Sequence, residues 1–533
     1  MQQILDLHIH SKYSRSCSPE LTLSNIDAVC RTKGVDIIAT GDFTYPEWFS
    51  DIKNKLEEIP PFNLPLSKGE NGDVPLLMKE GVGGGLYKLK SARDDKVKFI
   101  LSTEVALIYK DGGKVRRIHL VIHAPNLEAA EELNEYLDKD FNIRSDGRPI
   151  LGMSAPDLMK LCLGIDQRFL IYPAHIWTPW FAVFGSKSGF DKMEECFHEY
   201  AKNVYAIETG LSSDPEMNWR LSALDKLTIL SNSDAHSLPN IAREANVFEM
   251  KNISYDEIYE IIKNKKIYKG MNPRPRYAES SGGTSPRLWP TAREASLRGD
   301  DKRRGGSGDN SKNIGVKYTI EFYPEEGMYH YDGHRACGVS FTPEQTKKHK
   351  GVCPVCKKSL TIGVMNRVDE LADRPAFASQ SGATAGKPAS LGKTNRVAMS
   401  MPALTIADRG AATDITAGSN PPLGQAGFVK LVELDKIIAE AMDIKSRQSG
   451  KVQAEYRNLI KQGGNELNIL LNISPEDLGK MTDAAVAEGI KRVRQGRLII
   501  KPGFDGQYGE IRIFDQQEKK KNQQKSLFEY TPQ

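Results

Sequence analysis

The chain has 533 residues, more than the roughly 250 to 300 at which a single hydrophobic core usually stops growing, so two or three folded units are expected. Hydrophobic residues make up 39% and charged residues 27%, and no run of about 18 apolar residues is present, so no membrane span is predicted. A net charge of +4 does not by itself indicate nucleic-acid binding, and seven cysteines are too few for a disulfide framework.

Residues 1–268 repeat one pattern, in which a short apolar strand is followed by a polar cluster and then by a helical stretch. The predicted strands read ILDLHIH, VDIIATGD, KFILSTEVALI, IHLVIHA, RFLIYPAHI, VYAIETG, LTILSNSDAH and ANVFEM. Alternating strands and helices indicate a mostly parallel sheet, and seven or eight such units suffice to close a barrel. The N-terminus carries a strand pattern in place of a secretory signal, so we expect a cytoplasmic protein.

The remaining chain alternates between compact and low-complexity segments. The predicted divisions are a flexible linker over 269–316, a small zinc-binding module over 317–375, a second linker over 376–426, a helical C-terminal DNA-binding domain over 427–515 and a disordered tail over 516–533. In the C-terminal domain, Ser474 and Pro475 suit the N-cap and first position of a helix.

Nearly every predicted strand of the first segment ends in a residue type that binds metals. His8 and His10 have the same parity in their strand, so both side chains emerge on one face. Alone, such a pair could equally serve buried polar groups. The full set of predicted ligands is His8, His10, Asp42, Glu104, His123, His175, Asp234 and His236, which includes five of the ten histidines.

Mixed imidazole and carboxylate ligands predict a cluster of two or three divalent ions (Zn, Mn or Mg), in which Glu104 could bridge two of them. Such clusters cleave phosphoesters, because one ion makes bound water acidic and paired ions stabilise the attacking and leaving oxygens.

The strand ends HIH, TGD, STE, VIH, PAH and SDAH, in this order, resemble the PHP (polymerase and histidinol phosphatase) superfamily of metal-dependent phosphoesterases. The resemblance covers about residues 1 to 250 and implies an α/β fold, a distorted (β/α)7 barrel, with a trinuclear metal centre. Many members carry an acidic ligand several residues after His-x-His. Here that stretch reads SKYSRSCSPE, where Cys17 or a neighbour could substitute.

Further phrases resemble endonuclease Q, a DNA-repair enzyme family: GDFTYPEWF, PAHIWTPWFAVFGSKSGF, ETGLSSDP, PEEGMYHYDGHRACGV and CPVCKK. The resemblance implies hydrolysis of the phosphodiester 5′ to a deaminated base (uracil, hypoxanthine or xanthine) or an abasic site, with lesion-containing DNA as partner. Tyr45 stands where we expect the family often to have histidine.

Two acidic residues in ETGLSSDP, Glu208 and Asp214, follow another predicted strand, and we predict them as catalytic residues. For Asp214, capping of the turn before Pro215 is an equal alternative. The loop after His175 carries Trp177 and Trp180, which could hold an unstacked base or pack beneath the loop, and Lys187, which could meet a phosphate.

The small module contains two chelating pairs, His334-x2-Cys337 and Cys353-x2-Cys356. Four nitrogen and sulfur ligands satisfy a closed tetrahedral zinc site, which would be structural because the module has little core of its own. Ser340 occupies the usual position of another cysteine, so His334 must be the fourth ligand, with His330 as a less well-spaced substitute.

Two features near the C-terminus could meet DNA or a partner. Lys491, Arg492, Arg494, Arg497 and Lys501 form a basic stretch that could track phosphates or lie on a solvated face. The tail contains Gln524, Leu527 and Phe528, which resemble the motif by which repair proteins bind the sliding clamp.

Three functions remain open on the sequence alone. The first is a lesion-specific DNA endonuclease, the second a phosphoesterase acting on a small phosphorylated metabolite, and the third a non-catalytic DNA-binding or clamp-associated scaffold. The zinc module and aromatic loop favour the first over the second, and the nearly complete ligand set disfavours the third.

Overall fold

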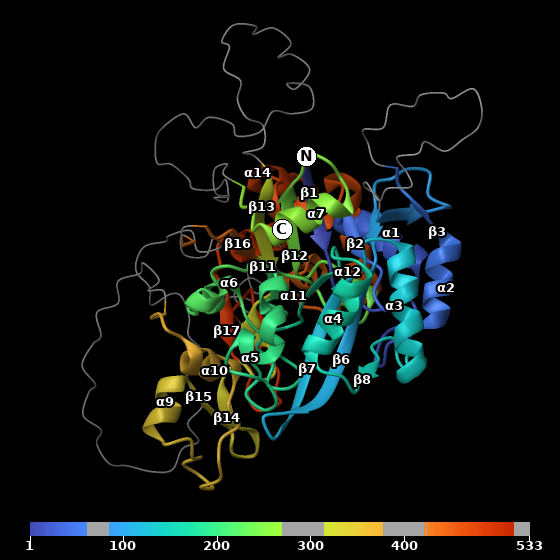
Figure 1. The fold of residues 1–533 in the computed structure, drawn as a ribbon. Helices are drawn as coiled ribbons and strands as arrows, with labels where there is room; N and C mark the ends of the chain where they lie inside the picture. Colours follow the sequence, from blue (N-terminus) through green and yellow to red (C-terminus); the bar gives the residue numbers. More distant parts are fainter. Residues whose placement is uncertain (61–84, 269–313, 377–420, 423, 516–533) are drawn as a thin grey trace, which may run out of the picture.

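The computed structural model describes residues 1–60, 85–268, 314–376, 421–422 and 424–515, and it is a mixed α/β structure (Figure 1). Its strands form one eight-stranded sheet, one four-stranded sheet and three two-stranded sheets among the described residues.

The largest sheet has the strand order β16-β13-β12-β1-β2-β5-β4-β3. Its strands are β1 (Gln2–Asp6), β2 (Ile37–Ala39), β3 (Leu56–Glu58), β4 (Leu86–Leu89), β5 (Lys98–Ile100), β12 (Ala245–Glu249), β13 (Gly315–Glu321) and β16 (Gly427–Lys430). The central strands β1, β2 and β5 run parallel, and all of β2 is buried, as expected for a strand covered on both faces.

The four-stranded sheet has the order β8-β6-β7-β9. Its strands are β6 (Ser102–Asp111), β7 (Lys114–His123), β8 (Ile150–Leu151) and β9 (Leu170–Pro173). β6 and β7 form a long antiparallel hairpin in register from Ser102↔His123 to Asp111↔Lys114. β10 (Ala206–Glu208) and β11 (Thr228–Leu230) pair in parallel as a separate sheet.

The α/β class predicted from the sequence is confirmed, whereas a closed barrel is not. The described strands belong to separate sheets, and no described sheet closes on itself. The sheets nevertheless meet: a single residue separates β5 from β6, and a parallel bridge joins Ile9, just after β1, to Ala235, after β11. The strand ends are thus brought together without a continuous ladder.

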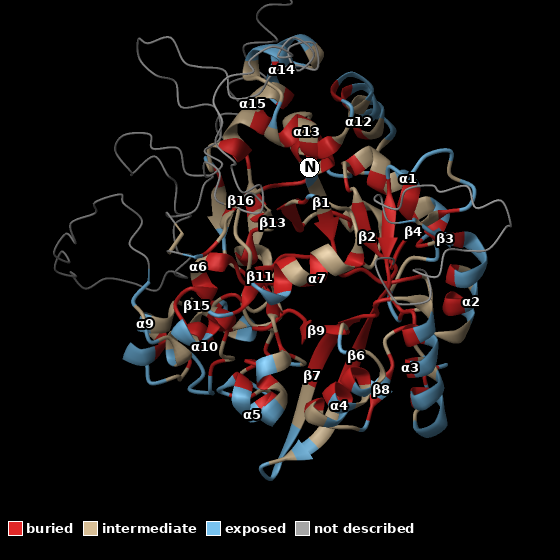
Figure 2. Cartoon of the chain, turned by 45° about the horizontal axis from the view of Figure 1, so that its top comes forward, coloured by how far each residue is buried: buried red, intermediate tan, exposed pale blue. Residues whose placement is uncertain are grey.

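Helices cover the outer sides of the sheets. Figure 2 shows that the strands are buried, whereas the outer faces of the covering helices, such as α2 and α3, are exposed. The helices of this part are α1 (Leu23–Lys33), α2 (Pro46–Lys55), α3 (Leu127–Asp140), α4 (Ala155–Ile165), α5 (Met193–Phe197), α6 (Pro215–Asn218) and α7 (Tyr255–Lys263). Several begin at a side chain that accepts a backbone N–H of the first turn, as Thr22, Asn126, Ser154 and Ser254 do.

The later segments add a small module and a helical group. Their elements are β14 (Asp332–His334), β15 (Val339–Phe341), α9 (Pro343–Lys348), α10 (Val364–Leu371), α11 (Leu434–Ala441), α12 (Gly450–Gly463), α13 (Glu466–Leu471), α14 (Pro475–Met481), α15 (Ala484–Arg494), β17 (Ile499–Lys501) and β18 (Glu510–Arg512). The predicted cap of α14 is confirmed: Ser474 accepts the N–H of Asp477, and Pro475 is the first residue.

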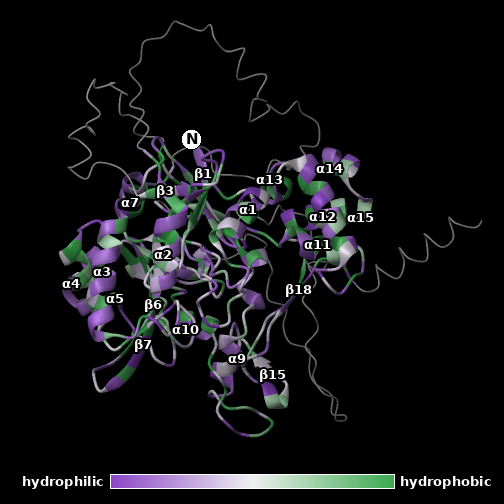
Figure 3. Ribbon diagram, turned by 90° about the vertical axis from the view of Figure 1, so that its right-hand side faces the viewer, coloured by the Kyte–Doolittle hydropathy of each residue, from purple (hydrophilic) through white to green (hydrophobic). Residues whose placement is uncertain are grey.

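The helical group lies beside α1 (Figure 3), where the Nζ of Lys33 lies 3.1 Å from a carboxylate oxygen of Glu466. Two strands that belong to the later segments of the sequence, β13 and β16, pair with the sheet of the first segment. β13 pairs with β12, and β16 pairs in parallel with β13, so both extend the sheet of the first segment.

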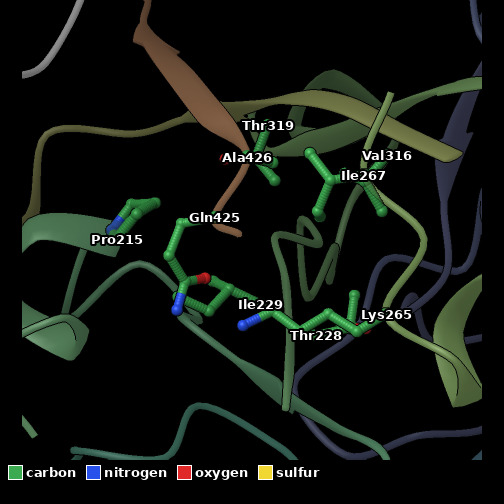
Figure 4. Close-up of a pocket in the computed structure, with 9 residues that line it drawn as sticks. All are labelled: Pro215, Thr228, Ile229, Lys265, Ile267, Val316, Thr319, Gln425 and Ala426. Atoms are coloured by element: carbon green, nitrogen blue, oxygen red, sulfur yellow. The ribbon is translucent and has the colours of Figure 1, made fainter. Parts of the chain in front are cut away.

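Two further observations bear on function. None of the described helices is long and apolar enough to cross a bilayer. A small pocket near β11, β13 and β16 (Figure 4), lined by Thr228, Lys265, Val316 and Gln425 among others, includes none of the predicted site residues.

Candidate metal centre

Four of the predicted ligands converge from separate elements. His8, His10, Glu104 and Asp234 each offer a ligand atom, and these atoms all lie within 4.8 Å of one another. The Nε2 atom of His10 lies 3.2 Å from Glu104 Oε2 and 3.1 Å from Asp234 Oδ1. The group therefore combines the segment after β1, the start of β6 and the segment after β11.

A second group shares Glu104 with the first. Glu104, His119 and His175 also place their ligand atoms within 4.8 Å, with His119 Nδ1 2.7 Å and His175 Nε2 3.2 Å from Glu104 Oε1. Glu104 thus presents one oxygen to each group, as the bridging role predicted for it requires. The sequence reasoning missed His119, although its equal parity with His123 on β7 was a usable signal.

Two predicted site residues are hydrogen-bonded to the Nδ1 atoms of the first two histidines. Asp42 Oδ1 is 3.0 Å from the Nδ1 of His10, and Glu208 Oε1 is 3.0 Å from the Nδ1 of His8. A carboxylate on one ring nitrogen fixes the tautomer and directs the other nitrogen toward the metal position. Asp42, predicted as a ligand, and Glu208, predicted as catalytic, are therefore placed to orient ligands.

The two remaining predicted ligands lie at the margin. The Nε2 of His123 is 3.1 Å from the hydroxyl oxygen of Tyr172, and the ring belongs to neither group of converging atoms. The His236 ring centroid lies 4.6 Å from that of His10, and its Nδ1 is 3.6 Å from Asp234 Oδ1. His236 thus borders the first group without joining it.

The backbone is unusual at three of the predicted ligands. Asp42, His175 and Asp234 have positive φ angles of 49°, 30° and 45°, which residues other than glycine rarely adopt and which often mark functional sites. The backbone of Gly210 packs closely against His175: a Cβ added to Gly210 would lie 2.3 Å from the Cβ of His175. Tight local packing therefore imposes the backbone conformation of His175.

Charge and burial set the protonation of the cluster. Burial raises the pKa of Glu104, but the neighbouring His119 and Arg148, with hydrogen bonds from His10 and His119, outweigh it and hold the pKa well below its usual value. Burial lowers the pKa of His119 to about 4. At His8, His10 and His175 burial also acts to lower the pKa, but the nearby carboxylates outweigh it and the pKa is raised. Because metal ions bind neutral imidazoles, an ion at this site would displace protons from these three histidines.

Arg148 was not anticipated from the sequence. Its Nη1 lies 3.0 Å from Glu104 Oε2, and its side chain is 24% exposed, so a guanidinium borders the cluster and still reaches solvent.

The donor set fits divalent metal ions. The Nε2 of His8 is buried and has no hydrogen-bond partner, although it faces Glu104 and Asp234 at 3.7 and 3.8 Å. A buried nitrogen without a partner is costly in a folded protein, and an ion among these atoms would satisfy it. Oxygen and nitrogen donors in this mixture suit Zn, Mn or Mg.

The other predicted catalytic residue, Asp214, lies elsewhere. Its Oδ1 accepts the N–H of Met217 at the start of α6, and its Oδ2 lies 2.8 Å from the Nζ of Lys430. The capping alternative describes its position, with an ion pair to the strand β16 in addition.

The aromatic loop divides into buried and exposed residues. Trp177 is fully buried and donates from Nε1 to Asn218 Oδ1, so it packs beneath the loop. Trp180 is 38% exposed and lies edge-on to Tyr329, while Lys187 is exposed. Of the two predicted tryptophans, only Trp180 is accessible to a base.

The four predicted zinc ligands are brought together. The ligand atoms of His334, Cys337, Cys353 and Cys356 lie within 4.8 Å of one another, and His334 Nδ1 is 3.5 Å from the Cys356 sulfur. His330 is buried and takes no part. The neighbouring apolar core contains only Val339 and Leu360 besides Cys353, so the module has little else to hold it.

The basic stretch near the C-terminus is largely satisfied internally. Arg494 is buried and donates to the carbonyl oxygens of Leu470 and Ile469, while Arg492 and Arg497 both pair with Glu488. This arrangement disfavours phosphate tracking by Arg492, Arg494 and Arg497, and the burial of Arg494 also departs from the solvated-face alternative. The predicted clamp-binding residues Gln524, Leu527 and Phe528 lie outside the described residues.

Comparison with known families and proteins gives matches over different parts of the chain. A family described as the MJ0043 C-terminal domain matches residues 433–497. The protein MJ0043 of Methanocaldococcus jannaschii is 26% identical over 342 residues, which span 63% of this chain but only 31% of that protein. The Bacillus subtilis protein YqxK is 24% identical over 454 residues, covering 83% of this chain and 86% of its own.

Two solved structures share the fold over nearly the whole chain. The lesion-specific endonuclease PfuEndoQ from Pyrococcus furiosus superposes with a TM-score of 0.65 at 24% identity, covering 96% of this chain and 95% of that one. An endonuclease Q complex with a 27-mer duplex containing an abasic lesion gives a TM-score of 0.66 at 24% identity, covering 97% of both chains. The resemblance read from the sequence is thus confirmed at the level of the fold.

Proposed function

We propose that this chain, which has the fold of the endonuclease Q structures, is a metal-dependent DNA-repair endonuclease. It hydrolyses the phosphodiester on the 5′ side of deaminated bases (uracil, hypoxanthine or xanthine) and abasic sites. The observation that carries the proposal is the pair of histidine-carboxylate groups joined through the fully buried Glu104. The fold shared with a DNA-bound endonuclease supports DNA as the substrate.

Each group of the cluster has a role that follows from its contacts. His8, His10 and Asp234 would hold one ion, and His119 with His175 a second, with Glu104 between them. Ions there would lower the pKa of water and neutralise charge on the phosphate. Asp42 and Glu208 keep the ring nitrogens of His10 and His8 aimed inward.

Two residues near the cluster suit the DNA. Arg148 supplies a fixed positive charge beside Glu104, which favours a phosphate at that place. Trp180, on the loop that follows His175, offers an accessible ring for an unstacked base. The distorted (β/α)7 barrel, a third ion, the structural zinc and clamp binding by the tail belong to the same proposal.

The test is incubation of purified protein and a divalent metal with duplexes that contain deoxyuridine, deoxyinosine, an abasic site or no lesion, beside a phosphorylated metabolite. We expect a lesion-dependent nick 5′ to the altered position, lost in His8→Ala and Asp234→Ala. Equal cutting of all duplexes, or hydrolysis of the metabolite alone, would contradict the proposal.

A further inference from the structure

The face of the β6–β7 hairpin that carries metal-centre residues continues outward beyond the centre. Residues directly opposite in an antiparallel pair point to the same face. Glu104 lies opposite Val121, and His119 lies opposite Ala106. The carboxylate of Glu104 and the imidazole of His119 are in contact, with 2.7 Å between Oε1 and Nδ1. The same face then holds the pair Arg117 and Ile108.

The next pair on this face is Val115 and Lys110, near the tip of the hairpin. From this point the hairpin is open to solvent, with Lys110 exposed and Val115 45% exposed. Figure 2 shows the hairpin projecting beyond the neighbouring elements, with an exposed end. Val115 and Lys110 are thus both accessible to a partner at the tip.

Positive charge on this face is not balanced. Among the described residues, no carboxylate lies within 4 Å of the charged groups of Lys110, Arg117 or Lys187. Lys187 lies beside the hairpin, because its neighbour Ser188 is hydrogen-bonded to the backbone of Arg117: the Ser188 carbonyl accepts the N–H of Arg117 at 3.3 Å, and the Ser188 hydroxyl donates to the carbonyl of Arg117 at 3.1 Å.

The opposite face of the hairpin differs. There Lys114 stands opposite Asp111, and the guanidinium of Arg116 lies 4.0 Å from the ring centroid of Phe190. Arg116 is thus held against Phe190, whereas Lys114 is exposed and, among the described residues, has no carboxylate within 4 Å of its charged group. Within the described part of the chain, the face of the metal centre carries two cations without a partner side chain, Lys110 and Arg117, and the opposite face carries one.

We propose that the β6–β7 hairpin is a DNA-binding arm, with Lys110, Arg117 and Lys187 contacting phosphates that flank the one at the metal centre. At about 3.4 Å per residue, Arg117 lies about 7 Å and Lys110 about 14 Å along the hairpin from His119. Phosphates along one DNA strand recur about every 3.4 Å of helix axis, so several fall within this reach. A two-stranded ribbon also fits the major groove, which seats Val115 and the tip.

The proposal rests on the proposed function and is tested with the full-length protein. The variant K110A/R117A/K187A removes the three cations, and the control variant R93A/K96A/K160A removes the same residue types from exposed positions outside both the hairpin and the predicted DNA-binding domain. Binding of an undamaged duplex is measured by fluorescence anisotropy across salt concentrations. Cleavage of a deoxyuridine duplex gives kcat and KM, and metal content is measured for each protein.

We expect the arm variant to bind duplex at least about tenfold more weakly and to lose about two to three from the slope of log affinity against log salt. Its kcat at saturating DNA and its metal content should stay within twofold of the wild type, because no metal-centre residue is changed. The control variant should match the wild type.

Unchanged affinity and salt slope in the arm variant would overturn the proposal, as would an equal loss in the control variant. The two proposals fail separately. A wild type that cuts lesions while the arm variant binds normally leaves the endonuclease standing without the arm. A wild type that binds duplex through these residues but cuts no lesion leaves the arm standing without the endonuclease.

Discussion

Residue by residue, the metal centre separates ligands from the groups that orient them. His8 and His10 each place one ring nitrogen on a buried carboxylate, Glu208 and Asp42, and the other toward the cluster. The same division separates the predicted ligands whose atoms converge from Asp42, which contacts a ring nitrogen of His10. Position along a strand decides which residues of a face reach the converging group.

The contrast between His119 and His123 gives a direct test. We expect His119→Ala to lose metal and cleavage, because its Nδ1 lies 2.7 Å from the shared Glu104. His123→Ala should keep its metal content. The cavity that the substitution leaves beside Tyr172 should lower the free energy of unfolding by about 2 kcal/mol. Metal content by mass spectrometry and thermal unfolding distinguish the two. Metal loss only in His123→Ala would restore the prediction made from the sequence.

Asp214 provides a second test at this scale. Asp214→Ala should lower the free energy of unfolding by about 3 kcal/mol, because it leaves Lys430 unpaired and removes a helix cap. Metal content and kcat of the folded protein should be unchanged. A large fall in kcat at unchanged stability would instead show a catalytic role.

The pH dependence of that loss has a defined sign. Burial raises the pKa of Asp214, but the charge of Lys430 outweighs it and the net pKa is lowered. A lowered pKa in the folded state means that the pair stabilises at neutral pH and that this contribution disappears as pH falls below the unfolded value of about 3.9. The difference in unfolding free energy between the wild type and Asp214→Ala should therefore shrink on acidification.

At the scale of elements, loops between strands set the site as much as the strands do. The loop before β8 carries Arg148, and its Gly147 packs closely against the side chain of Asp42. A Cβ on Gly147 would lie 2.4 Å from Asp42 Oδ2 and 2.5 Å from Ser14 Oγ. That oxygen cannot move freely, since it accepts from the backbone N–H and the hydroxyl of Ser11 at 2.7 Å each.

Gly147→Ala should therefore displace Asp42 and with it His10. We expect a loss of about 1 to 3 kcal/mol in stability and at least a tenfold fall in metal affinity, measured by calorimetric titration. Gly152→Ala is the matched control, because the nearest atom to its added Cβ is 4.0 Å away. Equal behaviour of the two variants would show that the loop yields without disturbing the site.

The sequence predicted much of this arrangement, and the parts that it missed have physical reasons. Strand parity and ligand chemistry were sufficient for His8, His10, Glu104, His175 and Asp234. They could not separate His119 from His123, because that choice depends on how β7 is aligned with β6. The burial of Trp177 and the contact of Arg148 depend on long-range packing, which no local pattern records.

At the scale of the whole molecule, helix α10 is one of several contacts that join the zinc module to the first segment. Arg367 on α10 donates to the carbonyl oxygens of Phe184 and Phe190, at either end of the loop stretch that follows Trp180. The module itself has a minimal core. We therefore expect the order of the module to depend on an ion held by its four predicted ligands, and the order of the aromatic loop to depend in turn on the module.

His334→Ala should lower the zinc content by one ion per chain and increase amide hydrogen exchange over β14, β15 and residues 353–361. His330→Ala is the control, since His330 lies outside the ligand group. Loss of zinc in His330→Ala with retention in His334→Ala would reverse the assignment of the fourth ligand.

The pairing of β13 with β12 bears on how this protein can be divided for study. A fragment that stops at residue 268, where the repeating strand-helix pattern ends, omits both β13 and β16. It would leave the apolar strand β12 (its residues Ala245, Val247 and Phe248 are buried) as a bare sheet edge that invites self-association. Failure of such a fragment to remain monomeric would reflect this missing neighbour strand and would say nothing against the metal chemistry.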